Sequence, residues 1–404
     1  MQLTVTLRVG IEVEFRVGTR ALPRREIPHT FRTGPAMPTK RQEEQDRKIR
    51  ICAVDAANRR PRPPGEDRLG FGVHFSDHMF CMDYERGRGW HSPRVQPYGP
   101  LSLDPAALVL HYGQEVFDGL KAFRTGEDAV RLFRPRDYME RMNRSAERLC
   151  MPPVDIEFVL KALKELVTVD RDWVPRARGA SLYIRPVTIA TEAALGVKVS
   201  KKYLFYVVTG PVGAYYAEGF NPTRILATDR YVRAVRGGIG EVKTAGNYAA
   251  SLLAAEEAYA QGYTQVLWLD ACSRSNVEEV GTSNIFFLLK GVLVTPPLSG
   301  SILPGVTRRS VIQLARDWAV PVEERVISIE EVIHGIRVGN LTEMFASGTA
   351  AVISPVGQIG YKGEDYTVNQ GVVGELSQLL FDEITGIQYG ERPDPHGWME
   401  PVLS

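Results

Sequence analysis

One lysine stands where the chain passes from a glycine-rich stretch into a run that is apolar along one side. This residue, Lys243, lies in "EVKTAGNYAAS", residues 241–251. Burial disfavours the charged form of a lysine, so its pKa falls and the neutral amine can act as a nucleophile or carry a proton. The position therefore predicts a catalytic lysine.

A carboxylate with matching chemistry occurs in "VEEVGTSNIFF", where Glu278 and Glu279 precede a Gly-Thr break and an apolar strand. Because neighbouring side chains of an extended chain point to opposite sides, we expect one of the two to face solvent and the other the interior. A buried carboxylate needs a partner. An arginine could serve, and so could the protonated ring nitrogen of a cofactor.

Two turns of small residues could bind a phosphate. A helix is expected to begin near Val306 and Thr307, and its first N–H groups would attract an anion. The second turn is "SGTA", residues 347–350. An ordinary helix entry and a plain hairpin turn explain the same residues. In combination with Lys243 and a carboxylate, the two turns suggest pyridoxal 5'-phosphate, whose aldehyde reacts with a lysine amine and whose protonated ring withdraws electrons.

The elements that position these residues form two successive blocks of mixed helices and strands, which indicates two domains of the α/β or α+β class. We predict a poorly ordered N-terminal extension over residues 1–67, an N-terminal domain over 68–210, a linker over 211–223 and a C-terminal domain over 224–404. A transit peptide, or a start codon assigned upstream of an internal start at Met37, would also explain the extension.

Within these blocks, "DPAALVLHYGQEVFDG" is predicted as one helix, with Asp104 as its N-cap and Gly119 as its stop. "LKAFRTGEDAVRLFR" is predicted as a hairpin that turns at Gly126. Further helices are expected at about 136–149 and 156–168, and another is expected to end near Gly262. Strands are expected at "SLYIRPVTIAT", "YLFYVVTGPVG", "RILATD", "TQVLWLD", "TSNIFFLL" and "GVLVTPP".

The composition limits the partners. Lys and Arg number 49 and Asp and Glu 48, so the formal net charge of +1 offers no general attraction for nucleic acid or an anionic membrane, and small molecules are the expected partners. The four cysteines have neither CxxC nor metal-ligand spacing, which suits a reducing cytoplasm and predicts no metal site. No apolar run is long enough for a membrane span, and no secretory signal is evident.

From residue 70 to residue 402, this sequence closely resembles the branched-chain amino acid aminotransferases, which are class IV aminotransferases of pyridoxal-phosphate fold type IV. Nine matching stretches carry the resemblance in family order: "LHYGQEVFDGLKAFR", "RLFRPRDYMERMNRSAERLCMP", "SLYIRP", "PVGAYY", "EVKTAGNYAAS", "QVLWLD", "EVGTSNIFF", "ILPGVTRRS" and "MFASGTAAVISPV". The resemblance implies a small N-terminal domain, a large C-terminal domain, a cofactor between the two and, as the expected assembly, a homodimer.

The resemblance also implies how the cofactor is held. Lys243 would be the Schiff-base lysine and the base that moves the proton, and Glu279 would hold the pyridine nitrogen. Tyr248 would hydrogen-bond the phenolic oxygen, and Thr282 would lie beside the cofactor. The phosphate would be bound by Arg141, the backbone of Val306 and Thr307, and Thr349. Without the resemblance, Arg141 would be read as a surface residue paired with Asp137.

The substrate residues follow from the same matches. The apolar lining would consist of Phe71, Phe117, Tyr183 and Ala350, with Leu195 and Val197 on a loop that reaches across from a second subunit. Tyr112 and Arg185 would accept the side-chain carboxylate of glutamate. Arg185 lies in an apolar strand, where a transient anionic partner makes physical sense. Tyr215 fits a tyrosine of the linker or of the cofactor site.

The implied reaction transfers the amino group of leucine, isoleucine or valine to 2-oxoglutarate. The alternatives are another fold type IV enzyme, either a D-amino acid aminotransferase or aminodeoxychorismate lyase, and a phosphotransferase suggested by "GGIGEVKT". In the latter segment, Val242 replaces the glycine that a P-loop requires before its lysine. Mammalian relatives carry a CxxC redox pair after the "SGTA" turn, whereas Ala351 and Ser354 stand here, so we predict no thiol regulation at this turn.

Overall fold

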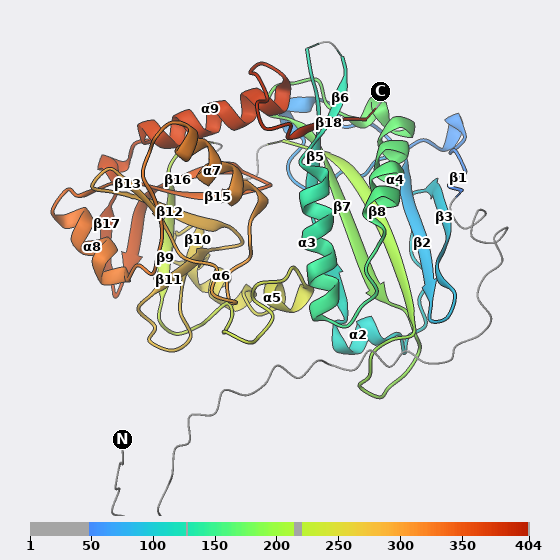
Figure 1. Ribbon diagram of the computed structural model, residues 1–404, viewed down its shortest axis with the longest axis horizontal. Helices are drawn as coiled ribbons and strands as arrows, with labels where there is room; N and C mark the ends of the chain where they lie inside the picture. The colour runs from blue at the N-terminus through green and yellow to red at the C-terminus, as the bar shows by residue number, and fades with distance from the viewer. Residues whose placement is uncertain (1–47, 127, 214–219, 403–404) are drawn as a thin grey trace, which may run out of the picture. The chain divides into compact units, whose positions relative to one another are not determined.

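The computed structural model describes residues 48–126, 128–213 and 220–402 of the 404-residue chain. The described residues form one compact unit, in which two nine-stranded sheets follow each other along the chain (Figure 1). This mixed arrangement of helices and strands confirms the predicted fold class. Tyr215 and the rest of residues 214–219, within the predicted linker, lie outside the described residues.

The first sheet has the strand order β1-β3-β2-β8-β7-β5-β6-β18, with β4 pairing β7. Its strands are β1 (Arg50–Ile51), β2 (His78–Glu85), β3 (Gly89–Pro97), β4 (Glu115–Phe117), β5 (Leu120–Arg124), β6 (Val130–Phe133), β7 (Ser181–Ala190), β8 (Lys202–Val212) and β18 (Met399–Pro401). The helices in this part of the chain are α2 (Leu108–Tyr112), α3 (Pro135–Arg148) and α4 (Ile156–Val169). The last strand thus returns to the first sheet, although the sequence analysis assigned all of 224–404 to the C-terminal domain.

The second sheet has the order β11-β10-β9-β16-β15-β12-β13-β14, with β17 pairing β16. Its strands are β9 (Thr223–Thr228), β10 (Gln265–Leu269), β11 (Val277–Val280), β12 (Asn284–Leu289), β13 (Val292–Thr295), β14 (Val322–Glu324), β15 (Leu341–Gly348), β16 (Val352–Tyr361) and β17 (Glu364–Thr367). The helices are α5 (Ala245–Ala249), α6 (Leu252–Ala260), α7 (Val306–Asp317), α8 (Ile329–Arg337) and α9 (Glu375–Tyr389).

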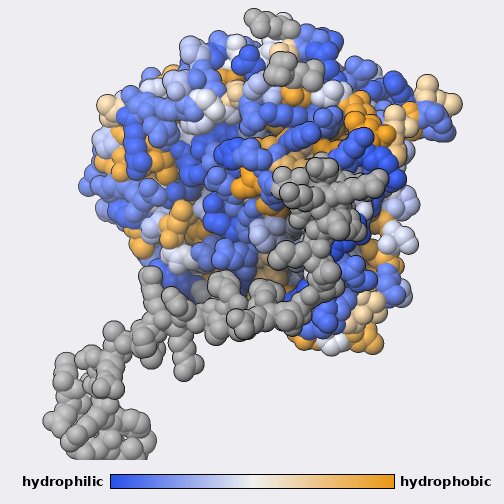
Figure 2. Space-filling model, turned by 45° about the vertical axis from the view of Figure 1, so that its right-hand side comes forward, coloured by the Kyte–Doolittle hydropathy of each residue, from blue (hydrophilic) through white to orange (hydrophobic). Residues whose placement is uncertain are grey.

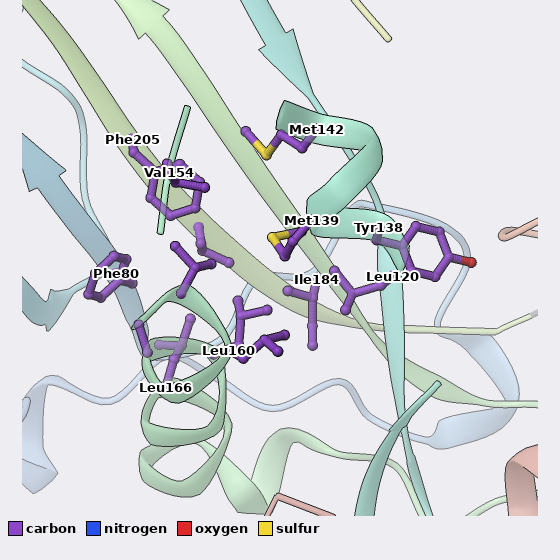
Figure 3. Packing of buried hydrophobic residues seen from close by; sticks show 14 of the residues in the cluster. Phe80, Leu120, Tyr138, Met139, Met142, Val154, Leu160, Leu166, Ile184 and Phe205 are labelled. Atoms are coloured by element: carbon purple, nitrogen blue, oxygen red, sulfur yellow. The ribbon is translucent and has the colours of Figure 1, made fainter. Parts of the chain in front are cut away.

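The core of the first half forms between its sheet and helices α3 and α4 (Figure 3). Helix α4 begins where the Asp155 side chain accepts a hydrogen bond from the backbone N–H of Phe158, which satisfies one of the free donors of its first turn. Its apolar residues, including Leu160 and Leu166, face Phe80 of β2 and Phe205 of β8. Burial of a large apolar side chain stabilises a fold by about 1.5–3 kcal/mol, so this cluster fixes α3 and its one buried arginine, Arg141.

The predicted helix over residues 104–119 is wrong at both ends: α2 begins at Leu108, with Ala107 and not Asp104 as its N-cap, and ends at Tyr112. Gly113 adopts a left-handed conformation with φ of 59°, which ends α2, and residues Glu115–Phe117 then form β4 and pair with β7. The apolar side chains of that segment therefore follow the strand, and the helical reading failed at one glycine. The hairpin, α3, α4 and the quoted strands agree with the predictions.

Residues 48–67 make specific contacts, although they were assigned to a poorly ordered extension. Strand β1 pairs with β3, and the backbone N–H of Val54 donates to Nε2 of the buried His78 at 2.9 Å. The backbone N–H of Arg60 donates to Asp77 Oδ1 at 2.7 Å. Deletion of residues 1–67 would therefore remove hydrogen bonds to the first half of the chain. The donors are backbone N–H groups, which sequence patterns do not reveal.

The described surface is polar with separate hydrophobic patches, as Figure 2 shows for one face. The most exposed large hydrophobic residues include Leu195 and Val197, at 71% and 83% exposure. The hydroxyl of Tyr112, which is also exposed, donates a hydrogen bond to the Leu195 carbonyl. Among the described helices, none is long and apolar enough to cross a membrane.

Candidate active site

A cavity of about 190 Å³ is lined by residues from both halves of the chain. It brings together most of the predicted site residues: Phe71, Phe117, Arg141, Tyr183, Arg185, Lys243, Tyr248, Glu279, Thr282, Val306, Thr307, Thr349 and Ala350. Three predicted residues do not line it, namely Tyr112, Leu195 and Val197, which lie together on the exposed surface. In the part of the chain that is described, no group of three or more His, Cys, Asp or Glu residues is placed to hold a metal ion.

Lys243 precedes α5 in the second half, and backbone hydrogen bonds tie its segment to the first half. Its N–H donates to Ser145 Oγ of α3 at 3.0 Å, and its carbonyl accepts from the N–H of Phe117 at 3.1 Å. The amine Nζ lies 2.5 Å from the hydroxyl of Tyr248, which stands five residues later on α5. The amine is therefore held in the cavity by a phenol and by a fixed backbone.

Glu279 of β11 is the acid of the cavity, with 2% exposure. Its Oε2 lies 2.6 Å from Arg233 Nε, and its Oε1 accepts from Asn284 Nδ2 at 2.9 Å. Burial raises the pKa of Glu279 to about 7, while the charges of Arg233 and Lys243 oppose that rise. The expected alternation is wrong for Glu278, which is also buried, because Ser301 Oγ donates to its Oε1 at 2.5 Å.

The two turns that were predicted to bind a phosphate both line one end of the cavity. Gly305 is the N-cap of α7, so the free N–H groups of this helix open there beside Val306 and Thr307. Across from them lies the turn between β15 and β16, in which the buried Ser347 Oγ has no hydrogen-bond partner among the described residues. Tyr138 of α3 holds this turn through a 2.8 Å hydrogen bond between its hydroxyl and Thr349 Oγ1.

Arg141 reaches the same end from α3 and is 4% exposed. Asp118, which is fully buried, binds it through two contacts: Oδ2 accepts from Nε at 3.0 Å and Oδ1 from Nη2 at 2.6 Å. Burial acts to lower the pKa of the Arg141 guanidinium, but the charge of Asp118 outweighs it. The pKa is raised overall, so Arg141 stays charged. It pairs with Asp118 and not with Asp137, which binds Arg134 and Arg309 instead.

The other end of the cavity is aromatic. Phe71 and Tyr183 meet edge to face at 5.1 Å between ring centroids, and Phe117 packs against Tyr248 at 4.9 Å. Arg185 enters this end from β7, where its Nη2 donates to the Tyr183 hydroxyl at 2.8 Å and its guanidinium lies 4.8 Å from the Phe117 ring. Its Nε is buried without a hydrogen-bond partner among the described residues.

Several site residues escaped the sequence analysis. Asp118 was read as part of a helix, and Asn284 as part of an apolar strand. Gly119 also lines the cavity, and a Cβ at this position would collide with the Tyr183 hydroxyl. The signal that could have found them is the interruption of apolar runs by Asp-Gly at 118–119 and by Asn284, which is buried at 5% exposure.

Comparisons with known proteins agree with this geometry. Residues 115–359 match the family model described as "Amino-transferase class IV". "Branched-chain-amino-acid transaminase 1" of Bacillus subtilis (strain 168) is 55% identical over 340 residues, which cover 84% of this chain and 96% of that protein. The chain belongs to the family of branched-chain amino acid aminotransferases. "Branched-chain-amino-acid aminotransferase 2" of the same bacterium is 51% identical over 351 residues, or 87% of this chain and 97% of the relative.

Solved structures of branched-chain aminotransferases have the same fold. The Escherichia coli enzyme superposes with a TM-score of 0.69 at 28% identity, covering 81% of this chain and 99% of that one. The branched-chain aminotransferase of Thermoproteus uzoniensis, solved with norvaline, superposes with a TM-score of 0.67 at 29% identity, covering 80% and 100%. The predicted family and fold type are thereby confirmed.

Class IV aminotransferases use pyridoxal 5'-phosphate, and the cavity fits this group. The unpartnered Ser347 hydroxyl and the free N–H groups of α7 can take a phosphate. A buried acid and a lysine beside a phenol stand in the same cavity. In "GGIGEVKT", which suggested a P-loop, a Cβ at Gly240 would collide with Ala234 and Ser301, so this glycine is packed against protein.

Proposed function

We propose that this protein transfers the amino group of L-leucine, L-isoleucine or L-valine to 2-oxoglutarate, yielding the branched 2-oxo acid and L-glutamate. The observation that carries the proposal is the aromatic end of the cavity, where one arginine with an unpartnered Nε lies among Phe71, Phe117 and Tyr183. Such a surface can take a hydrocarbon side chain or a carboxylate in turn.

Each residue of the cofactor end has a role in this proposal. Bound pyridoxal 5'-phosphate supplies a ring that withdraws electrons from the substrate Cα. Lys243 Nζ would bind the cofactor and move the proton at Cα, with the Tyr248 hydroxyl at 2.5 Å to orient it. Tyr248 would then also hydrogen-bond the phenolic oxygen of the cofactor, and Glu279 would hold its ring nitrogen.

The phosphate would be bound by Arg141, by the N–H groups of Val306 and Thr307 at the start of α7, and by the hydroxyl of Thr349. Thr282 would lie beside the cofactor. A phosphate at a helix N-terminus gains charge-assisted hydrogen bonds from backbone donors that have no other partner in the helix. Arg141 retains Nη1 for this purpose, since Asp118 takes Nε and Nη2 and the contact of Nη1 with the Pro304 carbonyl is 3.4 Å long.

At the substrate end, leucine would be held by apolar area against Phe71, Phe117, Tyr183 and Ala350. Glutamate would place its side-chain carboxylate at Arg185, where a charge-assisted hydrogen bond offsets the cost of burial. The exposed Tyr112, Leu195 and Val197 complete the pocket of a second copy in this proposal, because large apolar side chains exposed above 70% are unusual on a surface without a partner. We therefore propose a homodimer, and a cytoplasmic location for a chain whose four cysteines are unpaired.

The test is spectroscopic. The purified protein with pyridoxal 5'-phosphate should lose the absorbance band of the bound aldehyde when L-leucine is added, and 2-oxoglutarate should restore it. D-Alanine is the control donor and should leave the band unchanged. Loss of the band with D-alanine but not with L-leucine would contradict the proposal in favour of a D-amino acid enzyme.

A further inference from the structure

Two carboxylates are buried side by side on β11. Glu278 is 8% exposed and Glu279 2%, and they share one close arginine, Arg233, which follows β9 in the segment before Lys243. Burial of two adjacent acids is costly unless cations or hydrogen bonds compensate their charge. Arg233 therefore decides whether Glu279 can carry a charge.

The guanidinium of Arg233 is fixed in place. Its Nη2 donates to the carbonyl oxygens of Gly240, at 2.9 Å, and of Ser301. Its Nε lies 2.6 Å from Glu279 Oε2, with 9% and 3% exposure of the two side chains. This contact is an ion pair without the directed geometry of a hydrogen bond, since Nε–H points at no acceptor. Two backbone carbonyls thus hold the positive charge of Arg233 beside Glu279.

Ser301 links the two acids. Its carbonyl accepts from Arg233, while its hydroxyl donates to Glu278 Oε1 at 2.5 Å. The second oxygen of Glu278, Oε2, has no hydrogen-bond partner among the described residues. Glu278 is therefore satisfied only in part, and its negative charge acts against the ionisation of Glu279.

The charged groups that act on the Glu279 charge are Arg233, Lys243 and Glu278, and the Leu303 backbone and Asn284 of β12 add hydrogen bonds. With both glutamates ionised, Arg233 offsets one of the two negative charges. A protonated ring nitrogen would offset the other. Without Arg233, the cheaper state would be a protonated Glu279, which cannot stabilise a positive charge on the ring.

We propose that Arg233 is a positioning residue that keeps Glu279 ionised and oriented toward the ring nitrogen of the cofactor, with Glu278 as the opposing charge. This inference rests on the proposed function, because it assumes that Glu279 binds the ring nitrogen. It predicts that loss of the Arg233 charge and loss of the Glu278 charge change the ionisation of Glu279 in opposite directions. A purely structural role of Arg233 would not produce this opposition.

The test measures the affinity of cofactor-free protein for pyridoxamine 5'-phosphate by calorimetry from pH 6 to 9. This probe carries the ring and phosphate but forms no covalent bond with Lys243, so turnover does not enter. In the wild type, affinity should fall as the pH drops through the pKa of Glu279, which burial raises to about 7 in the free protein. Arg233→Met should displace the fall to higher pH, and Glu278→Gln to lower pH.

A displacement of one pH unit corresponds to an about tenfold change in affinity on the acidic side. Arg233→Lys should lie between the wild type and Arg233→Met, since it keeps the charge without both carbonyl anchors. Arg230→Met is the matched control: this arginine is exposed and pairs with Glu257, and its removal should leave the pH of the fall unchanged.

Displacements of Arg233→Met and Glu278→Gln in the same direction, or none, would overturn the proposal. If Arg233→Met does not fold, Arg233→Lys and Glu278→Gln must still move the fall in opposite directions. Failure of the proposed function looks different, because the wild type would then show the pH-dependent affinity and still not react with L-leucine.

Discussion

Arg141 and Arg185 line different parts of one cavity, and their surroundings differ. Arg141 is 4% exposed, and two contacts of 2.6 and 3.0 Å bind it to Asp118, so its orientation is set before any ligand arrives. Arg185 donates to the Tyr183 hydroxyl, lies over two aromatic rings and keeps a buried Nε without a partner among the described residues. Burial acts to lower the pKa of Arg185, but the interaction with Tyr183 raises it, and Asp118 adds to that rise without forming an ion pair with Arg185.

This difference fits the two kinds of ligand. A cofactor that stays bound is best held by groups with fixed positions, because little order is then lost on binding. A substrate end that accepts a hydrocarbon in one half-reaction and a carboxylate in the other cannot hold its arginine in a strong internal ion pair. A permanent carboxylate partner would compete with glutamate and place a charge near leucine.

The strongest way to break this comparison is Lys243→Ala. The substitution removes the amine that both ends depend on, so the amino transfer from L-leucine to 2-oxoglutarate should fall by at least about 10³-fold. Steady-state rates would measure the loss, and Lys161→Ala, which changes an exposed lysine of α4, is the control with unchanged rates. A Lys243→Ala variant with wild-type turnover would remove the assignment of the whole site.

The next largest effect is expected from Asp118→Asn at the cofactor end. It leaves the Arg141 charge buried without its ion pair, and breaking a buried pair costs about 3–5 kcal/mol of unfolding free energy. Affinity for pyridoxal 5'-phosphate should fall as well, because Arg141 loses its fixed orientation. Urea unfolding and cofactor titration would measure the two effects.

Asp137→Asn is the matched control for that variant. Asp137 of α3 also pairs with two arginines, Arg134 just before the helix and Arg309 of α7, but its side chain is 24% exposed, so about 0–1 kcal/mol is expected. Equal costs for the two substitutions would show that the Asp118–Arg141 pair gives the cofactor end no special rigidity.

A smaller and selective effect is expected at the substrate end from Arg185→Met. A charge-assisted hydrogen bond contributes about 1.5–3 kcal/mol, so the glutamate half-reaction should slow by roughly one to two powers of ten. The leucine half-reaction offers no side-chain carboxylate and should slow far less. Stopped-flow measurement of both half-reactions decides the question, and equal slowing would mean that Arg185 shapes the pocket or binds the α-carboxylate.

The comparison also separates what the sequence could predict from what it could not. Lys243, Glu279 and the two turns were found because unusual residue types stood at breaks in apolar patterns. Asp118 and Arg233 were not, since their partners lie 23 and 46 positions away and only the fold brings them together. Asp118 was also missed because it was assigned to a helix, whereas the left-handed conformation of Gly113 ends that helix and β4 follows.

The smallest predicted effect is the response to peroxide, which should leave the activity unchanged. Oxidation proceeds through the thiolate, and none of the four cysteines lines the cavity.

Cys81 packs in a hydrophobic cluster with Phe117, but burial raises its pKa to about 11, so only about one molecule in 10⁴ carries the thiolate at pH 7. Cys150 and Cys272 are exposed and can react without reaching the site, whereas the turn after β15 carries Ala351 and Ser354 and no thiol. Activity assays after peroxide treatment, with mass spectrometry of the cysteines, should therefore show oxidised Cys150 or Cys272 at full turnover. Inactivation that a thiol reductant reverses would mean that one of these cysteines is coupled to the cavity, and the substrate end would then be open to redox control despite the absence of a cysteine from its turn.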